Sequence, residues 1–306
     1  MSKLLFATCL AMSGMLALAQ DKVPSASVPV HMIVTVEALH GKEVPVLNRE
    51  DVVVHKGHDR LPVTDWVPLQ GEHAGLELFL LVDDASGASF GTYMEELRQF
   101  ITSQPATAAI GIGYMRNGTV LITQNLTTEH AAAAKALRLP LGTAGAGGSP
   151  YLSLSDLIKR WPASPERHEV LMVTNGIDPL GGAGLLNPYL LSAIENAQRA
   201  GIVVYSIYAP GVGHFGHSFW RMNWGQNHLA ELGEKTGAES YFLGFGTPVS
   251  FTPYLTDLAE RLTHQYLITF LAKPDKKAGF QAVKLTTEVP NAELVAAPVV
   301  YVPAGP

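Results

Sequence analysis

Carboxylate and hydroxyl side chains crowd into one short stretch of the chain, directly after an apolar run. The stretch is Asp83-Asp84-Ala85-Ser86-Gly87-Ala88-Ser89. Carboxylate and hydroxyl oxygens are the ligands that a hard cation such as Mg²⁺ prefers. The same side chains also cap turns and helices, so Asp84 and Ser86 have a purely structural interpretation as well.

Hydrophobic periodicity predicts the elements that position these residues. Near-continuous apolar runs at 76–82, 169–174 and 202–208 are typical of strands buried on both faces of a sheet. Asn117-Gly118 predicts a type I′ hairpin between strands 108–114 and 119–123, and a short strand is expected at 240–243. Helices are predicted around 92–101, 151–161, 188–201, 226–236 and 252–263, the first opened by a capping box of Thr92 and Glu95. The succession predicts an α/β fold with a doubly wound, mostly parallel, Rossmann-like sheet and functional loops at the carboxyl ends of its strands.

The segments on either side of this α/β region are rich in strand patterns. Candidates lie at 31–36, 50–55, 265–271, 281–288 and 294–302. We therefore expect an accessory β-module built from the N- and C-terminal segments. The expected division is a signal peptide at 1–19, an N-terminal β segment at 20–74, the α/β domain at 75–262 and a C-terminal β segment at 263–306.

The N-terminus has the pattern of a secretory signal. Lys3 precedes the short apolar stretch 4–18, and Ala17-Leu18-Ala19 is a small-x-small cleavage site. The stretch is too short for a transmembrane helix, so no membrane insertion is expected after its removal. The chain has one cysteine, Cys9, inside this segment, so thiolate chemistry is not expected of the exported protein. Its predicted location is periplasmic or extracellular.

Composition narrows the classes of partner. Lys and Arg total 21 against 27 Asp and Glu, for a net charge of −6. Because no basic cluster interrupts this acidic balance, nucleic acid is not expected as a partner. A hydrophobic share of 47% with only 16% charged residues favours a large buried core.

In this arrangement the chain resembles a von Willebrand factor A (vWA) domain. Such domains carry Asp-x-Ser-x-Ser after the first strand, a Thr or Ser in a later loop and an Asp after the fourth strand, which together hold Mg²⁺ in a metal-ion-dependent adhesion site. Asp84 and Ser86 match the first two positions, and Ser149 substitutes for the loop threonine. Ala88 and Asn175 stand where the second serine and the aspartate belong. The resemblance thus implies a degenerate site, for which we expect no cofactor or at most weak Mg²⁺ binding.

The resemblance extends beyond this site. The strand pattern at 34–57 and the segments 229–237 and 265–270 resemble the secreted vWA-related family abundant in acidobacterial genomes. It therefore covers most of the exported chain, and it implies an architecture more than an activity.

Two other interpretations remain open at this point. Gly87-Ala88-Ser89-Phe90-Gly91 matches the nucleophile elbow of serine hydrolases. Asp178 and a histidine would follow in the right chain order, the histidines being His214, His217, His228 and His264. However, four residues separate the strand from Gly87, whereas an elbow follows its strand directly. The pair His214 and His217, with His228 near in sequence, has spacing that suits a metal but lacks a local carboxylate.

The preferred hypothesis is a non-catalytic, exported protein-interaction module whose protein partner the sequence does not identify. Its binding face is expected at the carboxyl end of the sheet. The face would include Ser89, Asp178, Phe215, Phe219, Trp220 and Trp224, since aromatic side chains are frequent at the centres of interfaces. The alternative is a secreted serine hydrolase that uses Ser89.

Overall fold

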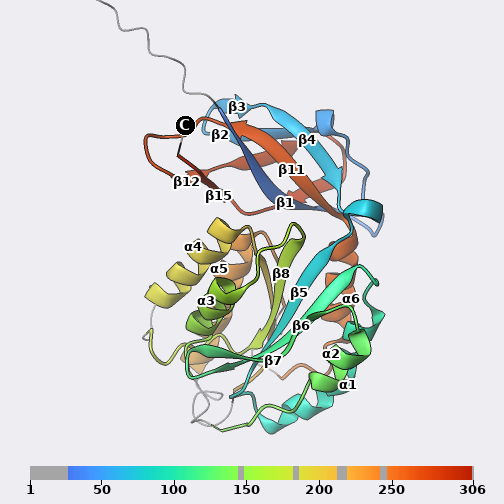
Figure 1. The fold of residues 1–306 in the computed structure, drawn as a ribbon, viewed down its shortest axis with the longest axis vertical. Helices are drawn as coiled ribbons and strands as arrows, with labels where there is room; N and C mark the ends of the chain where they lie inside the picture. The colour runs from blue at the N-terminus through green and yellow to red at the C-terminus, as the bar shows by residue number, and fades with distance from the viewer. Residues whose placement is uncertain (1–26, 144–147, 182–185, 212–218, 242–246, 305–306) are drawn as a thin grey trace, which may run out of the picture.

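The protein consists of an α/β domain with a β-module at one end (Figure 1). The computed structural model describes residues 27–143, 148–181, 186–211, 219–241 and 247–304. The predicted signal sequence at 1–19 lies outside these residues. The expected α/β fold with an accessory module from both chain ends is confirmed.

The central sheet has the strand order β10-β9-β8-β5-β6-β7. Its strands are β5 (Leu76–Asp83), β6 (Ala108–Arg116), β7 (Thr119–Thr127), β8 (Arg167–Thr174), β9 (Val203–Tyr208) and β10 (Ser240–Tyr241). All pair in parallel except β7, which is antiparallel to β6. Counted from β5, this is the doubly wound order 3-2-1-4-5-6, in which the chain switches direction between the first and fourth strands. The loops that follow β5 and β8 therefore meet at the switch point.

Helices cover both faces of this sheet (Figure 1). One face carries α1 (Met94–Ser103), α2 (His130–Ala136) and α6 (Thr252–Thr263), and the other carries α3 (Pro150–Arg160), α4 (Pro188–Ala200) and α5 (Phe219–Thr236). Alternate side chains of β5 enter the two apolar layers, with Leu78 and Leu80 on the α1 side and Phe79 and Leu81 on the α3 side. Burial on both faces explains why the run that encodes β5 is apolar throughout.

The β-module joins the two ends of the chain. Its largest sheet has the order β14-β1-β11-β4, formed by Ala292–Val295, Val28–Ala38, Gln265–Ala272 and Val63–Pro68. A second sheet joins β13 (Lys284–Thr287), β2 (Val52–Lys56) and β3 (Asp59–Leu61), and β12 (Gly279–Ala282) pairs with β15 (Val299–Val302). Short 3₁₀ helices lie at Arg49–Asp51, Gly71–His73 and Ala88–Tyr93. Residues 28–35 of β1 pair with β11. Neither terminal segment therefore completes the module alone.

Some predicted elements are wrong in detail. Thr92 and Glu95 form no capping box, because the 3₁₀ helix Ala88–Tyr93 runs into α1 and the Thr92 hydroxyl donates to the Ser89 carbonyl. The strand predicted at 294–302 is two strands in different sheets, since Pro298 interrupts it and lacks the N–H that a continuing ladder needs. The strand predicted at 281–288 likewise divides between β12 and β13.

The hairpin prediction is confirmed. Asn117 and Gly118 have φ values of 52° and 75°, as a type I′ turn requires. Within the described segments, no helix is long and apolar enough to cross a membrane.

Candidate functional site

The loops that follow β5 and β8 meet at the carboxyl end of the sheet, and the buried carboxylate of Asp83 joins them. Its Oδ2 accepts a hydrogen bond of 2.8 Å from the hydroxyl of Thr174 on β8, and its Oδ1 accepts one of 2.9 Å from the amide of Ala85. Burial raises the pKa of the Asp83 carboxyl, and the two hydrogen bonds only partly oppose it. Asp83 thus links the two central strands.

The next carboxylate, Asp84, is paired with an arginine. Arg138, between α2 and α3, donates from Nη1 to Oδ1 at 2.7 Å and from Nη2 to Oδ2 at 2.9 Å. The amide of Leu141 donates to the same Oδ1 at 3.0 Å. The Asp84 side chain is fully enclosed while that of Arg138 is 34% exposed. A bidentate pair of this kind is the strongest form of carboxylate recognition by a side chain.

Tyr114 on β6 fixes the position of this arginine. The Arg138 guanidinium carbon lies 3.8 Å from the centre of the Tyr114 ring, in a cation–π arrangement. The Tyr114 hydroxyl also donates to the carbonyl of Arg138 and accepts from its amide. Burial raises the pKa of Tyr114 to about 12. The hydrogen bond with Asp84 raises the pKa of Arg138, so the guanidinium stays charged.

A third carboxylate, Asp178, is also engaged within the protein. Its Oδ2 accepts from the hydroxyl of Ser149 at 2.7 Å and from the amide group of Asn187 at 3.1 Å. Its Oδ1 accepts from the amides of Leu180 and Gly181. Asp178 was predicted on the partner-binding face, but it is buried because these four donors enclose it. Ser149 was predicted as a metal ligand, and its hydroxyl also caps the N-terminus of α3.

Asn175 and Ser86 complete the set of predicted ligands. The Asn175 carbonyl oxygen accepts from the amide of Ile177 in a local turn. The Ser86 hydroxyl is buried and has no hydrogen-bond partner among the described residues. Mg²⁺ requires carboxylate oxygens directed at the ion in near-octahedral geometry, yet both oxygens of Asp84 face the Arg138 guanidinium. In this arrangement the Asp84 carboxylate is directed at Arg138 rather than at an ion. Within the described segments, no cluster of three histidine, aspartate or glutamate side chains could hold a metal.

The predicted binding face is partly aromatic in the structure. Phe219 and Trp220 are exposed and Trp224 is half-buried. They lie in the first turns of α5 rather than in a loop, because the helix begins at Phe219 and packs Met222 against Tyr208. Phe215, together with His214 and His217, lies outside the described residues.

Sequence reasoning missed several apolar side chains at this end of the domain. Leu139, Leu141, Leu180, Leu186 and Val249 are exposed on loops near the carboxyl ends of the strands. It also missed Arg138. The sequence signal for Arg138 and for Leu139 and Leu141 was Leu137-Arg138-Leu139-Pro140-Leu141, which has one charge among apolar residues outside any regular element.

Ser89 is exposed, and among the described candidates neither Asp178 nor His264 is positioned as its partner. Ser89 lies in a 3₁₀ helix and does not have the positive φ of a strained turn. The residues other than glycine with positive φ in the described segments are Asn117 and Asn291. Asp178 is engaged by Ser149, and the His264 ring contacts the Glu260 carbonyl at the opposite end of the domain, beside β11.

A fluorophosphonate probe is therefore expected to leave Ser89 unlabelled, because a serine without a positioned base stays a weak nucleophile. Mass spectrometry of the peptide containing Ser89 measures this directly. The heat-denatured protein serves as the background control. Labelling that needs the folded state would establish the hydrolase and contradict the proposal below.

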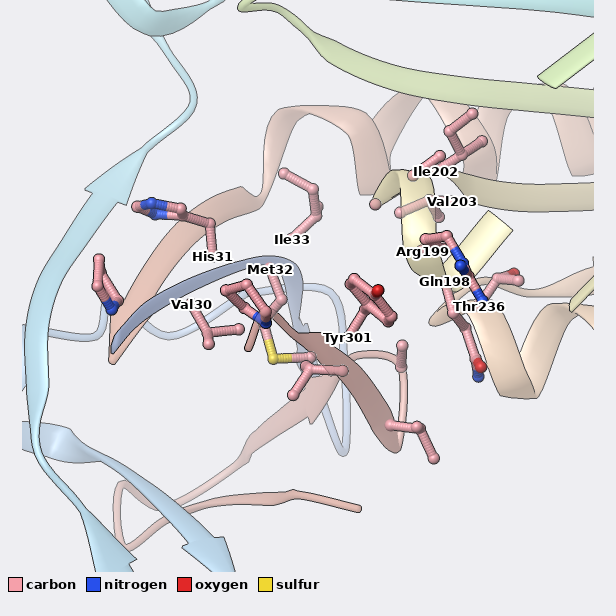
Figure 2. Close-up of a pocket in the computed structure, with 17 residues that line it drawn as sticks. Val30, His31, Met32, Ile33, Gln198, Arg199, Ile202, Val203, Thr236 and Tyr301 are labelled. Carbon is pink, nitrogen blue, oxygen red and sulfur yellow. The ribbon is translucent and has the colours of Figure 1, made fainter. Parts of the chain in front are cut away.

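A cavity of about 370 Å³ lies at the other end of the domain, between the β-module and the end of α4 (Figure 2). The Tyr301 ring stands between β1 and the α4 residues Gln198 and Arg199. None of the predicted site residues lines it, so it is separate from the carboxyl end of the sheet.

The similarities of this chain to known proteins are to solved structures. No protein-family model matches the chain, and no curated protein matches its sequence. Among solved structures, it is similar to an aerotolerance-related membrane protein from Bacteroides fragilis NCTC 9343, with 10% identity, 61% of this chain and 98% of the other covered, and a TM-score of 0.45. It is also similar to the ArnB paralog VWA2 from Sulfolobus acidocaldarius, with 10% identity, coverage of 90% and 76%, and a TM-score of 0.39. A third is the SpRpn10 VWA domain, with 10% identity, coverage of 60% and 94%, and a TM-score of 0.37. The similar structures thus include vWA domains, and the likeness concerns the fold alone.

Proposed function

We propose that this chain is an exported, non-catalytic protein-interaction module that binds a protein partner at the carboxyl end of its central sheet without a metal ion. The observation that carries the proposal is the concentration of exposed apolar side chains there. The set is Leu139, Leu141, Leu180, Leu186, Phe219, Trp220 and Val249. Apolar side chains gathered on one face of a protein are typical of an interaction surface.

The charges at this end support binding without a metal. Asp84, Asp83 and Asp178 are each neutralised or hydrogen-bonded by groups of the protein itself. A cation would have to displace Arg138 from Asp84 before it could coordinate both oxygens. Because the guanidinium already stacks on Tyr114, that displacement is unfavourable.

A photo-crosslinking residue tests the surface and its metal independence together. It is introduced at Trp220, 67% exposed on α5, and separately at Val46, 81% exposed in the β-module, as the matched control. The protein is expressed in its native host and irradiated in intact cell envelopes, with Mg²⁺ or with EDTA. We expect a discrete crosslinked protein from position 220 in both conditions and none from position 46, since partners contact the apolar face.

Three outcomes would contradict the proposal. A crosslink that disappears in EDTA would mean that the partner needs a divalent ion. The same adduct from position 46, or none from position 220, would move the binding surface away from this end of the sheet.

A further inference from the structure

We propose that Arg138 binds a carboxylate of the partner protein through its Nε and Nη2 hydrogens. The inference rests on the proposed function, because it names the chemistry of the partner at the same face. It requires that the guanidinium has hydrogen-bond donors left after it has bound Asp84.

A guanidinium has five N–H donors arranged in two usable forks. The fork of Nη1 and Nη2 is bound to Asp84, and the second Nη1 hydrogen reaches the carbonyl of Leu139 at 2.9 Å. These three bonds leave the side fork, which consists of Nε–H and one hydrogen of Nη2. Across the described segments, Nε donates to no acceptor, and it is not among the fully enclosed polar atoms that lack a partner. With 34% of the side chain exposed, the side fork can be reached from outside.

The arginine is also held in place before any ligand arrives. Asp84 binds one fork, and Tyr114 covers one face of the guanidinium at 3.8 Å. The hydrogen bonds between the Tyr114 hydroxyl and the backbone of Arg138 fix the position from which the Arg138 side chain extends. A side chain restrained in this way loses little conformational entropy when it binds, which favours affinity.

The surroundings select the class of ligand. Two coplanar oxygens of a carboxylate match the side fork in width and geometry. Leu139 and Leu141, which follow Arg138 in the chain, are both exposed, and apolar contacts with them would exclude water from the new ion pair. The side chain that fits is an aspartate or glutamate of the partner next to an apolar residue. Inorganic phosphate has compatible oxygens but gains nothing from the leucines, so it serves as a test of the assignment.

The probe is a fluorescein-labelled, amidated tripeptide of leucine, aspartate and leucine, and its control has asparagine in place of the aspartate. Fluorescence anisotropy with the full exported chain is expected to show the aspartate peptide binding about tenfold more tightly than the asparagine peptide. Arg138→Lys keeps a charge for Asp84 but has no side fork, so we expect it to abolish the preference. Circular dichroism establishes that Arg138→Lys is folded before binding is measured.

A second measurement locates the contact. The ¹⁵N–¹H signal of Arg138 Nε, assigned by its loss in Arg138→Lys, is expected to shift on addition of the aspartate peptide. The Nε signal of the exposed Arg49 is the internal control and should not move. Equal binding of the two peptides, an unshifted Arg138 signal, or a preference that survives in Arg138→Lys would each overturn the inference. Displacement of the peptide by inorganic phosphate more effectively than by acetate would assign the fork to phosphate and also overturn it.

The proposed function can survive this failure. If the unchanged protein does not distinguish the two peptides while position 220 still crosslinks its partner, the surface is correct and the carboxylate is not. Loss of the crosslink from position 220 in the otherwise unchanged protein would instead remove the proposed function.

Discussion

Replacing Arg138 with methionine is expected to lower the free energy of unfolding by about 3 kcal/mol, because it leaves the enclosed carboxylate of Asp84 without its partner. Methionine keeps much of the apolar volume of the arginine side chain, so the loss reports mainly on the charge. Urea denaturation followed by circular dichroism measures it. Addition of Mg²⁺ to the unchanged protein is expected to leave the same transition where it is, since an ion that does not bind cannot stabilise.

The matched controls separate a buried pair from an ordinary one. Arg49→Ala removes the exposed ion pair with Glu50, whose side chains are 52% and 70% exposed, and should change stability by less than about 1 kcal/mol. The double variant Asp84→Asn with Arg138→Met removes both charges and should recover part of the loss. If Arg138→Met is as harmless as Arg49→Ala, the pair does not hold the site together.

Replacing Glu169 with glutamine is expected to stabilise the protein at neutral and alkaline pH. Glu169 lies on β8 with both carboxylate oxygens buried and without hydrogen-bond partners in the described part of the chain. Burial raises its pKa from 4.5 to about 7, and the charge of Arg167 and the neighbouring Gln265 side chain only partly oppose this. Below the unfolded pKa the carboxyl is neutral in both states and no stability is lost. As the pH rises from the unfolded pKa to the folded pKa, the unfolded state loses its proton while the buried carboxyl keeps it, so stability falls by up to about 3 kcal/mol, and the loss is complete above the folded pKa.

The pH profile of unfolding tests this directly. Glu169→Gln should be more stable than the unchanged protein by about 3 kcal/mol near pH 8 and about equal to it near pH 4. Glu234→Gln on α5 is the control, because this side chain is 74% exposed and its charge needs no desolvation. A gain in stability that is the same at both pH values would show that the effect comes from packing and not from ionisation.

The central sheet could be predicted because burial on both faces leaves a signal in consecutive residues. The runs of β5, β8 and β9 are apolar at nearly every position, and the Asn117-Gly118 turn follows from local backbone preference. The first turns of α5 could not be predicted in the same way. In the structure their Met222 joins Tyr208 and Leu229 in one buried cluster, and packing between different elements leaves no periodic pattern along the chain.

In the candidate site, too, some features could be predicted from the sequence and others could not. The positions of Asp84, Ser149 and Asn175 near the carboxyl ends of strands could be predicted from motifs and topology. Their chemical state could not, because the partner of Asp84 is 54 residues away along the chain. The burial of Asp178 could not be predicted for the same reason, because the hydroxyl that binds it belongs to Ser149, the N-cap of α3, 29 positions earlier.

The attachment of Arg138 to the backbone has a kinetic and thermodynamic consequence. A dissolved ion leaves its site by diffusion, and its return depends on its concentration. The guanidinium can leave Asp84 only by a change of side-chain rotamer, and it returns from a distance of a few ångströms whatever the composition of the medium. Dilution, chelators and the ionic composition of the medium therefore have little effect on how often Asp84 is paired with a positive charge. The positive charge of Arg138 is part of the chain and reaches Asp84 when the protein folds.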